Sequence, residues 1–179
     1  MDTIEIRASL EKRNAVLEAH PEKAHIRGGP ETATLEGGLR CRVDGPNGQR
    51  IYTDMPPALG GGGSAPNPGW YLRAAIASCT ATVVAMRAAH LGITLTTLSV
   101  SVEADTDQRG LLGTDQRISA GVSTLRTRVR IGAGGTDPDT LRELVVWGDA
   151  HSPVACTVRN APACSVDVEI VSGGSETTS

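Results

Sequence analysis

The chain has 179 residues, a formal net charge of −3, no Phe, and only two Trp and two Tyr. This length suits a single domain whose core is built from Ala, Val, Leu and Ile. The mildly acidic balance argues against a nucleic-acid-binding protein. The longest apolar stretch, residues 74–86, is shorter than the roughly 20 residues of a membrane-spanning helix, so no membrane partner is expected.

Residues 3–19 have the apolar spacing of a helix, and Pro21 ends it, so residues 1–29 are predicted to form an N-terminal helical arm. The arm lacks the apolar segment of a signal peptide, which favours a cytoplasmic protein. The four cysteines are widely spaced and form no Cys-x-x-Cys pair. We therefore expect neither a disulfide framework, nor a metal site, nor a cofactor.

Strands are predicted next over residues 33–35, 39–43 and 49–53. Residues 45–48 read Gly-Pro-Asn-Gly, a strong turn signal, so the second and third strands should form a hairpin. Strict alternation in the second strand places Leu39, Cys41 and Val43 on one face, which we expect to face the core.

Four consecutive glycines at 60–63 precede a predicted long helix. Asn67 is a favourable N-cap, Pro68 a favourable first helical residue, and Gly92 the expected C-terminal stop after Leu91. Residues 74–86 are apolar on nearly every side apart from one Ser and two Thr. Such a helix is expected to be buried all round.

The remaining chain predicts strands at 95–104 and 122–131, separated by a long polar loop, and then a helix from Asp137 to about Trp147 or Ala150. A last strand is expected at 164–171, with the alternating residues facing inward, and a disordered tail at 173–179. The inward residues of this strand are Cys164, Val166, Val168 and Ile170. This order indicates an α+β domain over residues 30–172 with helices on antiparallel sheet.

The run GGGGSAPNPGWYLRAAIASCT, residues 60–80, resembles the first signature of the OsmC/Ohr family, the osmotically induced and organic hydroperoxide resistance proteins. The resemblance extends over roughly residues 30–171. It implies the OsmC-like α+β fold, in which antiparallel sheets surround buried central helices in an intertwined homodimer.

The resemblance also implies a chemistry. Cys79 matches the family's peroxidatic cysteine, which attacks an organic hydroperoxide and becomes a sulfenic acid. The family's second, resolving cysteine falls on Ser152, in the sequence His151-Ser152-Pro153-Val154, and the family's activating Glu falls on Gly69. The activating Arg lies in the strand region, where the candidates are Arg40, Arg42 and Arg50.

Each candidate has a second interpretation. Cys79 could be a small apolar residue that fits between packed helices, and core packing is the simpler role for Cys41 and Cys164. Cys156 is a candidate replacement for the missing resolving thiol. His151 is a candidate base or ion-pair partner of Cys79, or else a surface residue at a helix end.

Two functions remain open at this point. The first is a one-cysteine peroxidase that reduces organic hydroperoxides through Cys79 and is regenerated by an external thiol reductant. The second is an OsmC-like dimer that lacks peroxidase activity and binds a small hydrophobic ligand in the same cleft, as the losses at Gly69 and Ser152 suggest. A purely structural dimer has no specific feature in its favour.

Overall fold

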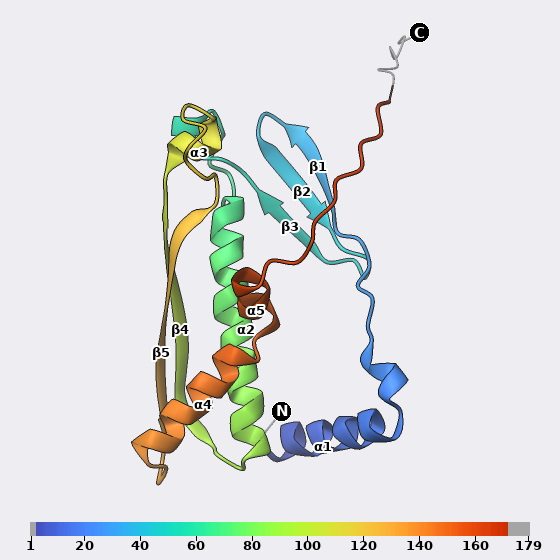
Figure 1. The fold of residues 1–179 in the computed structure, drawn as a ribbon, viewed down its shortest axis with the longest axis vertical. Helices are drawn as coiled ribbons and strands as arrows, with labels where there is room; N and C mark the ends of the chain where they lie inside the picture. The colour runs from blue at the N-terminus through green and yellow to red at the C-terminus, as the bar shows by residue number, and fades with distance from the viewer. Residues whose placement is uncertain (1–2, 172–179) are drawn as a thin grey trace.

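The computed structural model describes residues 3–171, which form an α+β fold of two antiparallel sheets around one long helix (Figure 1). The β4–β5 pair runs alongside the central helix α2, and the three-stranded sheet β1–β2–β3 stands beside the N-terminal half of α2. The strands are β1 Thr32–Gly37, β2 Arg40–Asp44, β3 Arg50–Thr53, β4 Leu95–Thr106 and β5 Val122–Ala133. The helices are α1 Thr3–Ala19, α2 Pro68–His90, α3 Gln108–Leu112, α4 Pro138–Ala150 and α5 Pro153–Arg159, with short 3-10 turns at Pro21–Ala24 and Pro57–Leu59.

The three-stranded sheet forms as its alternating sequence predicts, but its apolar face is open. Leu35 pairs with Cys41, and Val43 pairs with Ile51, so these apolar side chains share one face. Leu35 is 63% exposed and Ile51 is 41% exposed. No element of the described chain therefore covers this face fully.

The central helix α2 begins and ends where its capping residues predict. The Asn67 side chain accepts a hydrogen bond from the backbone N–H of Trp70 (2.9 Å). At the other end Gly92 adopts a left-handed conformation (φ +73°), and the N–H of Ile93 donates to the carbonyl of Ala88 (2.8 Å).

The expectation that α2 is buried all round is wrong for a single chain. Its buried residues form essentially one stripe, Ile76, Thr80, Val84, Ala88 and Ala89. That stripe packs against β4, α4 and α5. Leu72, one turn before Ile76, and Met86, outside the stripe, remain 37% and 39% exposed. One chain does not supply enough elements to enclose a helix of 23 residues.

By length and composition alone, α2 would also qualify as a membrane span. A single helix of this kind is weak evidence, because the core helix of a soluble protein meets the same criterion.

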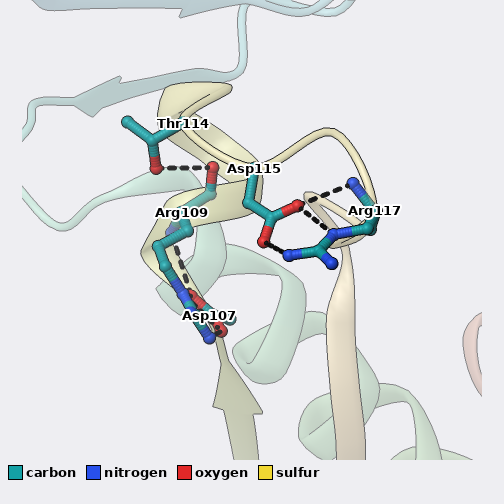
Figure 2. A network of polar contacts seen from close by, with 5 residues as sticks. All are labelled: Asp107, Arg109, Thr114, Asp115 and Arg117. Carbon is teal, nitrogen blue, oxygen red and sulfur yellow. Dashed lines mark hydrogen bonds and ion pairs between the residues drawn. The ribbon is translucent and has the colours of Figure 1, made fainter.

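The connection between β4 and β5, expected as a polar loop, carries the short helix α3 and is held by two Asp–Arg pairs (Figure 2). The Arg109 guanidinium donates to Asp107 (2.6 Å) and the Arg117 guanidinium to Asp115 (2.8 Å). The pairing with Arg109 lowers the pKa of Asp107 to about 2. Thr114 adds a hydrogen bond to the backbone carbonyl of Arg109.

Helix α4 approaches α2 closely because Gly148 has no side chain. A Cβ added at Gly148 would lie 2.4 Å from Cγ2 of Val84 and 3.1 Å from its Cα. Val84 and Leu144 are buried in the core cluster at this contact. A core without Phe thus reaches tight packing by bringing two backbones together.

The C-terminal strand expected over residues 164–171 is not formed, which corrects that prediction. Residues 160–171 have no regular structure, and Val166, Val168 and Ile170 are 79–91% exposed. Cys164, expected to face inward, is exposed as well. The alternation typical of a strand is present, but a strand needs a hydrogen-bonded neighbour and this segment has none within the described residues. The tail predicted at 173–179 lies outside those residues.

The glycine-rich loop before α2 is folded around the carboxylate of Asp54, which is only 3% exposed. Asp54 accepts hydrogen bonds from the backbone N–H groups of Met55, Gly62 and Ser64 and from the Ser64 hydroxyl. A Cβ at Gly61 would lie 1.9 Å from the carbonyl oxygen of Met55, so only glycine fits there. The bonds from Ser64 lower the pKa of Asp54 below its usual 3.8.

Replacement of Gly148 by Ala should destabilise the protein by about 1–3 kcal/mol, because the added methyl group overpacks the α2–α4 contact. The free energy of unfolding in urea measures this effect. Gly134→Ala is the matched control, because a Cβ at Gly134 has no heavy atom within 4 Å. Equal unfolding free energies for the two variants would contradict the packing argument.

Acid should weaken the glycine-rich loop through Asp54. A carboxyl whose pKa is lowered by folding stabilises the folded state above its unfolded pKa, and this stabilisation is lost as the pH falls through the lowered value. Asp54→Asn should therefore reduce the free energy of unfolding at pH 7, with a smaller further loss between pH 5 and roughly pH 2 than in the wild type. Asp167→Asn, on the exposed C-terminal segment, is the charge-matched control and should retain the wild-type pH dependence.

Candidate functional site

Cys79 lies near the middle of α2, beside the stripe that faces α4 and α5. Its direct neighbour Thr80 is fully buried, whereas Cys79 is only partly buried. Among residues 3–171, the Cys79 thiol has no hydrogen bond, ion pair or disulfide partner. A thiol in such a place becomes reactive only if a positive group is brought to it.

Ser152, which the family resemblance predicts at the position of the second cysteine, is fully buried at the start of α5. Its hydroxyl lies 3.4 Å from the hydroxyl of Thr80, which joins α5 to α2 one residue from Cys79. The side chain of Ser152 is an alcohol, which cannot form a disulfide with Cys79.

The three candidate arginines lie on the three-stranded sheet, and none interacts with Cys79 within the described chain. Arg42 and Arg50 both bind Asp44, each with its Nε 2.7 Å from a carboxylate oxygen. Arg40 instead donates from Nη1 to the Ser64 hydroxyl (2.7 Å), and its guanidinium carbon lies 4.4 Å from the centre of the Tyr52 ring.

His151 is held by Trp147. The two rings stack with centroids 3.9 Å apart, and Nδ1 of His151 lies 2.8 Å from the backbone carbonyl of Trp147. Arg87 covers the same indole at 4.6 Å. These contacts engage His151 at the end of α4, and no contact of His151 with Cys79 is present among the described residues.

Cys156 lies on α5 and lines a cavity of about 770 Å³ between β5, α4 and α5. Its thiol donates to the carbonyl of Ala150 (2.9 Å), and Nη2 of Arg159 lies 3.8 Å from the sulfur. The cavity wall is mostly apolar, with Ile76, Leu125 and Val145 among its residues. Cys79 is not part of this wall, so the cavity and the proposed reactive thiol are separate in one chain.

Two polar residues near the arginines were missed by the sequence argument, Asp54 and Ser64. The glycines at 60–63 supply backbone N–H groups, and N–H groups that become buried need an acceptor. A single Asp shortly before the loop was the available signal. Within the described residues, no group of three or more His, Cys, Asp or Glu is placed to hold a metal ion.

The OsmC family model, described as OsmC-like protein, matches residues 61–167. Comparison with curated proteins gives no match. Solved structures with the same fold include an OsmC-like protein from Mycoplasma pneumoniae, with a TM-score of 0.63 and 15% identity over 76% of this chain and 91% of that one.

Two further structures are named organic hydroperoxide resistance proteins. The protein from Legionella pneumophila has a TM-score of 0.55 and 20% identity over 75% of this chain and 93% of that one. The protein from Elizabethkingia anophelis, with thiocyanate bound, has a TM-score of 0.55 and 17% identity over 76% and 93%. The shared fold and a family match over more than half of the residues lead to one conclusion: this chain belongs to the OsmC-like protein family.

Proposed function

We propose that the protein is a one-cysteine, thiol-dependent peroxidase that reduces organic hydroperoxides through Cys79. The observation that carries the proposal is the partly buried, unpaired thiol on α2, set in the family's glycine loop and Asn-Pro helix start. Two structural neighbours that bear the name of organic hydroperoxide resistance proteins support the same class of substrate.

The proposed reaction needs one protein thiol. The Cys79 thiolate attacks the outer oxygen of the hydroperoxide, the O–O bond breaks, and the alkoxide leaves as an alcohol after taking up a proton. The sulfenic acid on Cys79 then reacts with an external thiol, which forms a mixed disulfide and releases water. A second external thiol reduces that disulfide and restores Cys79.

The alcohol at Ser152 is the reason to propose an external reductant. The hydroxyl of Ser152 contacts the hydroxyl of Thr80, which is the residue next to Cys79 on α2. A thiol at position 152 would be a candidate to resolve the sulfenic acid, whereas an alcohol cannot form a disulfide. Cys156 is one turn further along α5 and is engaged with Ala150. A reducing compartment supplies small thiols, which agrees with the cytoplasmic location that we propose.

A second copy of the chain is part of the proposal. Within residues 3–171, three apolar surfaces are uncovered: the side of α2 with Leu72 and Met86, the face of the three-stranded sheet, and the alternating C-terminal segment. Surfaces of this kind mark protein–protein contacts. An intertwined homodimer would cover them and would bring an arginine of one copy to Cys79 of the other.

The cavity lined by Cys156 favours a second candidate function, the binding of a small hydrophobic ligand. Its volume of about 770 Å³ and its apolar wall suit such a molecule. A Cys79→Ser variant that binds the same ligand as a wild-type protein without peroxidase turnover would favour this function over the first.

Wild-type protein treated with cumene hydroperoxide should form a sulfenic acid at Cys79, which dimedone labelling and peptide mass spectrometry detect. Cys79→Ser should abolish turnover with an external thiol, whereas Cys164→Ser, at an exposed cysteine, should leave it unchanged. Oxidation of Cys79 no faster than that of free cysteine would exclude the proposed peroxidase.

Mixed dimers test whether the arginine comes from the second copy. Cys79→Ser and Arg40→Met subunits, co-expressed with different tags and purified through both, should recover about half of the wild-type activity, because one of the two sites is complete. Each homodimer should be inactive or nearly so. A mixed dimer as inactive as the homodimers would contradict an arginine acting between copies.

A further inference from the structure

The three arginines of the sheet differ in how far their charge is neutralised. Arg42 binds two carboxylates, with Nε 2.7 Å from Asp44 and Nη1 3.0 Å from Glu36. Arg50 binds Asp44 at 2.7 Å. The closest partner of Arg40 is the neutral hydroxyl of Ser64, and the one carboxylate that pairs with it among the described residues, Glu36 at 3.5 Å, is shared with Arg42. Arg40 therefore keeps the most uncompensated positive charge.

The hydroxyl of Ser64 is oriented by the buried carboxylate of Asp54. An ionised carboxylate only accepts hydrogen bonds, so the single hydroxyl proton of Ser64 must point at Asp54 (2.7 Å). A lone pair of the same oxygen is thereby left to accept from Arg40 (2.7 Å). The result is a directed chain, Arg40 to Ser64 to Asp54, whose far end is anchored by backbone N–H groups of the glycine-rich loop.

A second contact fixes the plane of the Arg40 guanidinium. It lies over the ring of Tyr52, and the backbone carbonyl of Tyr52 accepts a hydrogen bond from the hydroxyl of Tyr71 on α2 (2.9 Å). The Arg40 side chain is thus tied to the helix that carries Cys79, although it remains 34% exposed. A guanidinium has five N–H donors, and the contacts with Ser64 and Glu36 leave several of them free.

We propose that Asp54 and Ser64 are positioning residues that hold Arg40 for the Cys79 thiolate, and that they take over the role of the Glu missing at Gly69. The inference rests on the proposed function and adds the identity of the activating arginine and its support. A neutral hydroxyl fixes the guanidinium without neutralising it, and the buried carboxylate behind Ser64 fixes the hydroxyl. In the proposed dimer, Arg40 then faces the thiolate of the second copy, and the carboxylate that it shares with Arg42, Glu36 at 3.5 Å, compensates its charge only in part.

The pH dependence of Cys79 alkylation tests the chain of contacts. Only a thiolate reacts with iodoacetamide, so the midpoint of the rate profile, followed on the Cys79 peptide by mass spectrometry, reports the pKa of this thiol. Wild-type protein should have a midpoint below the ordinary value of about 8.5. Ser64→Ala should raise the midpoint and slow alkylation at pH 7 about tenfold, the effect of one charge-assisted hydrogen bond.

Three further variants separate positioning from mere loop stability. Ser64→Thr keeps the hydroxyl and should retain the wild-type midpoint. Arg40→Met should raise the midpoint at least as far as Ser64→Ala does. The double variant should have the same midpoint as Arg40→Met, because Ser64 acts only through its contact with Arg40. Arg50→Met, on the same sheet, should keep the wild-type midpoint. Thermal unfolding of each variant reports the structural effect separately.

The outcomes distinguish this inference from the proposed function. A raised midpoint in Arg40→Met with an unchanged midpoint in Ser64→Ala would overturn the role of Ser64 and Asp54 and leave the peroxidase proposal intact. A lower Tm in Ser64→Ala without a change in midpoint would likewise assign Ser64 to loop stability alone. A wild-type midpoint equal to that of a free thiol would show that the Cys79 thiolate is not activated, which would contradict both proposals.

Discussion

The contact between α2 and α4 is the interaction on which the rest of the structure depends. The chain has few aromatic side chains and no Phe, so its core cannot be filled by large rings. Gly148 instead lets the backbone of α4 come against Val84, and the buried stripe of α2 extends from there towards Thr80 and Ile76. The angular position of Cys79 at the margin of that stripe follows, because its neighbour Thr80 is fixed inside.

The residues of the proposed site come from two layers, the helix α2 and the three-stranded sheet. The helix supplies a partly buried thiol that has no charged partner within the described residues. The three-stranded sheet supplies positive charge through three arginines. Their side chains are held by Asp44, by Glu36 and by the loop around Asp54. Neither layer is sufficient alone for the proposed reaction, and the alcohol at Ser152 is the reason why that proposal includes an external thiol.

Local signals predicted much of this fold. The cap at Asn67, the stop at Gly92 and the hairpin turn at residues 45–48 each depend on contacts between near neighbours in the sequence, and each is present in the structure. The OsmC-like α+β fold is also confirmed. The burial of α2 and the C-terminal strand were predicted wrongly for one chain, because both depend on what lies beside them in space.

The candidate site was predicted only in part. The Ser152 hydroxyl lies 3.4 Å from that of Thr80, the neighbour of Cys79, whereas the match of Ser152 to the family's second cysteine stays a prediction. Asp54 and Ser64 escaped notice because they are ten residues apart and meet only when the glycines turn the chain back. No pattern of apolar or charged residues in the sequence predicts this contact. The choice of Arg40 over Arg42 and Arg50 depends on which side chains each arginine contacts, and the sequence does not show those contacts.

The unpaired C-terminal segment has a consequence for how this protein exists in a cell. An extended backbone with apolar side chains on alternate positions presents unpaired N–H and C=O groups, which can form a β-ladder with an exposed strand of another chain. If its native neighbour is another copy, the folded state is governed by mass action, and dilution itself acts as a denaturant. The concentration of the chain in the cell then sets the fraction of chains that are folded as dimers.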